Sequence, residues 1–121
     1  MYFVVFATDK LGTGELRAIL RPQHRRHLRE PGDHPVRVLL GGPTLSDDES
    51  AMNGTVLVIE AGSLAVVQAF VADDPYMRAE MFSRIEVRPW DWSLGQPNAE
   101  TLRQVSRVAA GNGAGTAPDA D

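Results

Sequence analysis

The sequence contains no cysteine among its 121 residues. This absence excludes a disulfide framework and any metal site with thiolate ligands. No segment approaches the roughly 18 consecutive apolar residues that a membrane-spanning helix needs, so the membrane is not an expected partner. The apolar N-terminus, residues 1–8, is short and follows no positive charge, which predicts a strand and not a secretory signal. We therefore expect a cytoplasmic protein.

Positive charge is also scarce, since 16 acidic residues outnumber 12 basic residues and give a formal net charge of −4. Proteins that bind nucleic acid usually present a basic face, so nucleic acid is not an expected partner. Five arginines nevertheless gather between positions 17 and 29. Such a cluster is most often a solvated helix face. The alternative is an anion-binding surface, because arginine pairs with carboxylates and phosphates.

The length of the chain predicts one domain, because domains commonly contain about 100–200 residues. After Trp92 the composition changes, and the last twelve residues are rich in glycine and alanine without a bulky apolar side chain. Segments of that kind tend to be disordered. We predict a domain over residues 1–92, a C-terminal extension over 93–109 that can form a short helix, and a disordered tail over 110–121.

Four segments have the pattern of β-strands, because they are β-branched and aromatic or alternate between polar and apolar residues. The first is apolar throughout, which predicts a central strand covered on at least one face. Gly41–Pro43 is interpreted as the turn that ends the second strand, and Pro89 as the end of the fourth. The predicted strands are 2–7, 36–40, 55–60 and 83–88.

Apolar residues spaced three and four positions apart predict two helices. An interior proline disrupts a helix but is tolerated in the first turn, so the first main helix is expected to begin at Pro22. Ser63 is expected to cap the second helix at its N-terminus, and Asp74–Pro75 to end it. The predicted helices are 22–30 and 64–71, with short helical turns at 15–20 and 76–81.

The resulting order of elements is β-α-β-β-α-β. It predicts a ferredoxin-like α+β fold, in which both helices cover one face of a four-stranded antiparallel sheet. The first strand offers apolar residues to both faces of this sheet. We therefore expect a homodimer in which a second subunit covers the open face, sheet against sheet. The alternative is a monomer whose open face is in contact with water.

Two residues are candidates for proton chemistry. His24 lies four residues from both Leu20 and Leu28, on the apolar side of a predicted helix. A histidine in that place is either a buried structural residue or a general acid or base, because imidazole titrates near neutral pH. Asp74 either forms the turn before Pro75 or orients the imidazole of His24 and stabilises its cation.

Other kinds of site have little support in the sequence. His24 and His27 could supply two ligands to a metal ion and an aspartate the third, but this signal is weak, so a metal site is not expected. The sequence has no Gly-x-Ser-x-Gly motif and no dinucleotide fingerprint, and Gly41–Pro43 is too short for a phosphate-binding loop. We therefore expect no organic cofactor and no covalent acyl chemistry.

A series of short motifs runs in order along residues 1 to about 90, and together they resemble the YciI-like (YCII-related) family. Each motif alone is weak, whereas their order and spacing are fairly specific. Thr55 stands where the family usually has serine, and the chain continues further beyond Trp90 than most members do. The motifs are Asp9-Lys10, Arg17, Arg21-Pro22-x-His24, Gly42-Pro43, Gly54-Thr55, Asp74-Pro75-Tyr76 and Val87-Arg88-Pro89-Trp90.

The resemblance implies a ferredoxin-like protomer that forms a dimeric α+β barrel, with a cleft holding a histidine–aspartate dyad. By position the catalytic dyad is His24 and Asp74, and the substrate-binding neighbours are Arg17, Arg21 and Tyr76. The family includes a dehydrochlorinase of chlorinated hydroxyhydroquinone breakdown, and muconolactone isomerases share the wider fold. The implied function is a cofactor-independent lyase or isomerase acting on a small aromatic or lactone metabolite. The alternative is a non-catalytic module that binds such a molecule.

Overall fold

The structure is a computed structural model that describes residues 1–95. The predicted disordered tail over 110–121, and all but the first three residues of the predicted extension, lie outside the described residues. Within residues 1–95, no helix is long and apolar enough to cross a bilayer. The cytoplasmic location stays a prediction.

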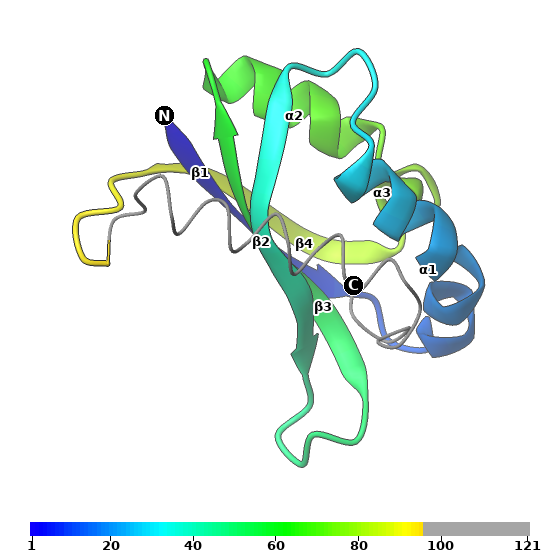
Figure 1. Ribbon diagram of the computed structural model, residues 1–121. Coiled ribbons are helices and arrows are strands. Elements are labelled where there is room, and N and C mark those ends of the chain that lie inside the picture. Colours follow the sequence, from blue (N-terminus) through cyan, green and yellow to red (C-terminus); the bar gives the residue numbers. More distant parts are fainter. Residues whose placement is uncertain (96–121) are drawn as a thin grey trace.

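The described residues form a four-stranded antiparallel sheet with helices on one side (Figure 1). The strand order is β2-β3-β1-β4, so the first strand lies in the middle and pairs with both the third and the fourth. This arrangement confirms the predicted ferredoxin-like α+β fold. Along the chain the elements are β1 (Tyr2–Asp9), α1 (Gly14–Arg29), β2 (Val36–Leu45), β3 (Met52–Ala61), α2 (Leu64–Ala72), α3 (Pro75–Arg78) and β4 (Phe82–Trp90).

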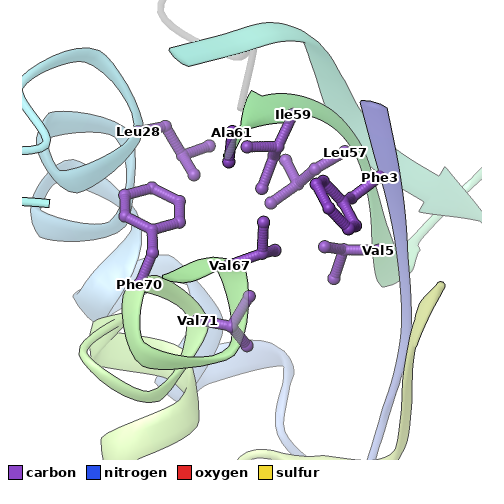
Figure 2. Packing of buried hydrophobic residues seen from close by; sticks show 9 residues of the cluster. All are labelled: Phe3, Val5, Leu28, Leu57, Ile59, Ala61, Val67, Phe70 and Val71. Atoms are coloured by element: carbon purple, nitrogen blue, oxygen red, sulfur yellow. The ribbon is translucent and has the colours of Figure 1, made fainter. Parts of the chain in front are cut away.

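The hydrophobic core lies between the helices and one face of the sheet (Figure 2). Alternate residues of a strand point to opposite faces, so one set from β1 and β3 meets the helices. Ser63 accepts a hydrogen bond from the backbone of Val66 at 3.3 Å, which confirms the predicted cap of α2. The residues of the core are Phe3, Val5, Leu28, Leu57, Ile59, Ala61, Val67, Phe70 and Val71.

The first helix is longer than the sequence predicts. α1 begins at Gly14 and continues through Pro22, which was expected to be its first residue. An interior proline removes one backbone hydrogen bond and costs about 3 kcal/mol. Buried side chains on both sides of the proline offset this cost, with Arg17 in the turn before it and His24 in the turn after it. Pro22 itself is exposed, on the side of the helix away from the core.

The second strand also extends beyond its predicted end. Gly41–Pro43 does not form a turn and continues the pairing with β3, after a bulge between Val38 and Leu40. β2 is an edge strand, where proline is tolerated because its missing N–H faces no partner strand. A side chain at Gly41 would require Leu57 to move, since an added Cβ would lie 2.8 Å from Leu57 Cδ2. Pro89 is likewise accommodated in the other edge strand, β4.

The face of the sheet opposite the helices carries several large apolar side chains, and we call it the open sheet face. Strand pairing places Phe6, Leu40 and Trp90 on it. Phe6 is 46% exposed, Leu40 45% and Trp90 38%. Within residues 1–95, no helix covers this face (Figure 1). The described part of the chain therefore leaves an apolar surface in contact with solvent.

Candidate active site

The inward face of α1 carries the first half of the candidate site. Arg17, Arg21 and His24 follow one another at spacings of four and three residues, so they lie on the same side of the helix. Arg17 and His24 are buried, with exposed fractions of 3% and 0%, and Arg21 is half-buried. Part of the arginine cluster therefore faces the protein interior, whereas Arg26 and Arg29 are solvent-exposed as predicted.

The second half of the site lies at the joint between α2 and α3. Asp74 is extended and caps α3, and its Oδ1 accepts a hydrogen bond from the backbone N–H of Tyr76 at 2.9 Å. Pro75 follows as the first residue of α3, a position in which its missing N–H costs nothing. This cap and the fixed backbone angle of Pro75 hold the Asp74 carboxylate in one place. The side chain is buried, as is that of Tyr76.

The two halves meet in a buried hydrogen bond. His24 Nδ1 lies 2.9 Å from Asp74 Oδ1 and 2.8 Å from Asp74 Oδ2. An ionised carboxylate can only accept hydrogen bonds, so Nδ1 carries the hydrogen and donates it. A neutral ring with its hydrogen on Nδ1 presents Nε2 as its basic atom. The predicted proximity of His24 and Asp74 is thus present, although 50 residues separate them in the sequence.

Tyr76 lies against the imidazole and is not at the surface. Its ring stacks on the ring of His24, with centroids 3.9 Å apart and planes at 17°. The guanidinium carbon of Arg17 lies 4.8 Å from the centroid of the same tyrosine ring, a distance typical of a cation–π contact. Tyr76 therefore connects Arg17 to His24 and restricts the orientation of the imidazole.

Arg17 is held by groups from two strands. Its Nε donates to Asp9 Oδ2 at 2.8 Å, and its NH2 group donates to the Gly54 carbonyl at 2.7 Å and to Thr55 Oγ1 at 2.9 Å. Thr55 is itself buried, so its hydroxyl contacts Arg17 within the protein interior. The guanidinium of Arg17 thus makes extensive contacts within the protein, next to the candidate dyad.

The groups that support Arg17 have little signal in the sequence. Asp9 lies at the end of β1 and belongs to one of the short motifs, which was its only signal. The contribution of Gly54 is its backbone, because an added Cβ would overlap the Ala7 carbonyl oxygen. Neither the contact of Asp9 with Arg17 nor the close approach of Gly54 to Ala7 can be recognised from the adjoining sequence, since each depends on residues of another element.

Among residues 1–95, no three histidine, aspartate or glutamate side chains are close enough to bind a metal ion together. A surface hollow of about 350 Å³ lies at the end of the sheet where β1 begins and β4 ends. Asp9 and the candidate dyad lie toward the other end of β1. The residues that line the hollow are Met1, Tyr2, Pro89, Trp90, Asp91 and Trp92.

Comparison with known proteins identifies relatives that span most of this chain. The pattern of the YCII-related domain family matches residues 1–91. Protein YciI of Escherichia coli is 30% identical over 95 residues, which cover 74% of this chain and 96% of that protein. An uncharacterized protein of Haemophilus influenzae shows the same identity and coverage, 30% over 95 residues.

One solved structure is similar in both sequence and fold. It is the 5-chloro-2-hydroxyhydroquinone dehydrochlorinase of Burkholderia phenoliruptrix in complex with 2,5-dihydroxybenzoquinone. Its sequence is 32% identical, the match covers 75% of this chain and 94% of that chain, and the TM-score is 0.64. A relative with this fold therefore binds a small, oxygen-rich ring compound.

Proposed function

This chain belongs to the YCII-related domain family, and we propose that it is a cofactor-independent enzyme that moves a proton on a small aromatic or lactone metabolite. In this proposal His24 is the general acid or base and Asp74 orients it. The observation that carries the proposal is the pair of contacts from both Asp74 oxygens to His24 Nδ1, at 2.8 and 2.9 Å. In this proposal they hold the ring so that Nε2, on the side away from Asp74, is its basic atom.

The proposed chemistry uses only this pair. His24 Nε2 takes a proton from a hydroxyl group or from a carbon next to a carbonyl, and Asp74 stabilises the imidazolium that forms. In an elimination, the electron pair of the broken bond forms a double bond and a leaving group departs as an anion. The imidazolium then gives its proton to water. In an isomerisation, the imidazolium returns the proton to a different carbon of the same molecule.

Arg21 is the proposed contact for an anionic substrate group. It lies on the same side of α1 as His24, three residues before it, and arginine binds carboxylates and phenolates through charge-assisted hydrogen bonds. The contacts of Arg17 with Asp9 and Thr55 favour a supporting role over the substrate contact expected from the sequence. Tyr76 supports the imidazole from its stacked position. Because His24 is fully buried, a substrate reaches Nε2 only after a local rearrangement opens this part of the protein.

The test is substrate profiling with the purified protein, using hydroxylated and chlorinated hydroquinones and small lactones. For a compound that is turned over, we expect His24→Gln to lower kcat by about 10²–10⁴-fold, the usual contribution of general acid–base catalysis. The matched control is Arg26→Gln, which changes an exposed residue of the same helix to the same side chain. Full activity of folded His24→Gln would contradict the proposed mechanism.

The same experiment distinguishes the alternative function, a non-catalytic binding module. In that case compounds of these classes raise the thermal unfolding midpoint of the wild-type protein but none is converted. An enzyme is expected to show both binding and conversion, and the His24→Gln variant to keep the first and lose the second.

We also propose that a second copy of this chain covers the open sheet face. The exposed large apolar side chains of Phe6, Leu40 and Trp90 on this face support the proposal, because burying apolar surface against a partner removes it from water, which is favourable. Light scattering at micromolar concentration should give the mass of two subunits. Phe6→Asp should give one subunit, whereas Ile19→Asp, at an exposed position of α1, should not change the mass. A single-subunit mass for the wild-type protein would refute the dimer.

A further inference from the structure

The position of Asp74 depends on the short joint between α2 and α3. Asp73 caps the C-terminus of α2 with a backbone that is still helical at φ −89° and ψ −3°. Asp74 then turns to an extended conformation at φ −63° and ψ 132°. The helix that follows, α3, has only four residues. A helix of that length is not stable alone, because the first turn fixes several residues for one hydrogen bond. Contacts with other elements therefore help to hold the joint, in addition to the Asp74 cap and the contacts of Asp74 and Tyr76 with His24.

Asp73 supplies such contacts from both of its oxygens. His34, in the loop between α1 and β2, donates from Nε2 to Asp73 Oδ2 at 2.6 Å. Arg78, in the last turn of α3, donates from its NH2 group to Asp73 Oδ1 at 2.8 Å. The hydrogen bond to Arg78, together with that to His34, lowers the pKa of Asp73, so the carboxyl is ionised at neutral pH. One carboxylate thus connects the end of α2, the end of α3 and a loop about forty residues earlier.

His34 is itself held in place by the protein core. Its ring meets the ring of buried Phe70 edge-on, with centroids 5.6 Å apart, and meets His27 in the same manner at 5.9 Å. His27 stacks on Phe70 at 4.3 Å and its Nε2 lies 2.8 Å from the Phe70 carbonyl oxygen. His34 is therefore supported by groups of α1 and α2, and its side chain is only 22% exposed.

We propose that Asp73, His34 and Arg78 form a positioning network that sets the location of the Asp74 carboxylate, and through it the tautomer of His24. The constraint passes through a single peptide unit, because Asp73 and Asp74 are neighbours in the chain. None of the three residues touches His24 in any contact described above. The inference rests on the proposed function in one respect, the role of Asp74 in orienting His24. Its test needs no substrate.

The experiment measures the ring nitrogens of His24 by NMR, through their long-range couplings to the carbon-bound ring protons. The chain has only three histidines, so the His27→Gln and His34→Gln variants assign the spectrum. In the wild-type protein, the two nitrogens of His24 should give well-separated signals, because the hydrogen stays on Nδ1. In Asp73→Asn, His34→Gln and Arg78→Gln the two signals should move toward each other. The matched control is Asp33→Asn, at an exposed site in the same loop as His34, which should leave them in place.

Two outcomes would overturn the proposal. One is that the variants lower the thermal unfolding midpoint but leave both His24 signals at their wild-type positions, as expected of a joint that only adds stability. The other is that Asp33→Asn moves the signals as much as Asp73→Asn does. Arg78→Gln changes a side chain that is 67% exposed, so at least one variant of the network should remain folded. Failure of the proposed function would appear separately, as turnover retained by His24→Gln.

Discussion

The protein contains two histidine–aspartate pairs whose aspartates are consecutive, Asp73 and Asp74. The hydrogen bonds are of similar length, 2.6 Å for His34–Asp73 and 2.8 Å for His24–Asp74. Their surroundings differ. The side chains of the His24–Asp74 pair are 0% and 7% exposed, whereas those of the His34–Asp73 pair are 22% and 43% exposed. Distance alone therefore does not identify the pair that is suited to chemistry.

Burial changes what each pair can do. In a low-dielectric interior a hydrogen bond is electrostatically stronger, and an unpaired polar group is costly, so His24 and Asp74 each depend on the other. Partly exposed ion pairs are screened by water and contribute little to stability. The outer pair of His34 and Asp73 is thus suited to connecting segments, and the inner pair to holding one protonation state of an imidazole.

The largest expected difference between the two pairs is in how much each aspartate contributes to the free energy of unfolding. Asp74→Ala removes the cap of α3 and leaves the Nδ1 hydrogen of His24 without its buried acceptor. From these two effects we expect a loss of about 2–4 kcal/mol in the free energy of unfolding. Asp73→Ala should cost much less, because its carboxylate is partly exposed. Chemical denaturation of both variants measures the difference, and equal losses would contradict it.

A smaller difference is expected between the wild-type protein and Asp73→Asn, in how the unfolding midpoint changes at acidic pH. The pKa of Asp73 is lowered from its ordinary value of 3.8, mainly by the hydrogen bond from Arg78. A lowered carboxyl pKa stabilises the folded state above the ordinary value, and this stability is lost as the pH falls below it. Unfolding midpoints between about pH 2 and pH 5 should therefore fall less steeply in Asp73→Asn than in the wild-type protein. Hydrogen bonds from Ser50 lower the pKa of a second carboxyl, Asp48, to about 2. The Asp48→Asn variant should therefore show the same change in acid, and it is the reference for Asp73→Asn.

The smallest expected difference is the effect of salt. At about 1 M salt the screening length falls to about 3 Å, which weakens exposed charge pairs far more than buried ones. The stability difference between wild type and Arg78→Gln should shrink in 1 M NaCl. The difference between wild type and Asp74→Asn should stay constant. Parallel denaturation at low and high salt measures both, and a salt-dependent Asp74→Asn difference would show that the inner pair is reached by solvent.

The sequence was sufficient for the order of elements and the fold class, because strand and helix patterns are local. It failed where long-range contacts override a local rule. The continuation of α1 through Pro22 depends on Arg17 and His24, whose partners lie on other elements. The extension of β2 through Pro43 depends on its place at the edge of the sheet, which no local pattern shows.

The candidate site likewise has one part that could be predicted from the sequence and another part that could not. His24 and Asp74 were recognised from their residue types and their places in the chain, together with the family resemblance. The contacts of Arg17 with Asp9 and Thr55, and those of Asp73 with His34, join residues that are 8, 38 and 39 positions apart. Nothing in a local stretch of sequence indicates that such groups meet.

The strand order β2-β3-β1-β4 also has a consequence for how the chain folds. β2 and β3 are joined by a short turn, in which Asp48 accepts hydrogen bonds from Ser46 and Ser50, so this hairpin closes only a small loop. β1 must find β3 and β4, with Val5 opposite Leu57 and Val87, and these pairings close loops of about 50 and 80 residues. We expect the hairpin to form early and the central strand to dock late, because long-range pairing is slow. Pulse-labelled hydrogen exchange would then show protection in β3 before β1. The buried contacts of Arg17 with Gly54 and Thr55, which span 37 and 38 positions, complete only in that last step. This links assembly of the site to the slowest stage of folding.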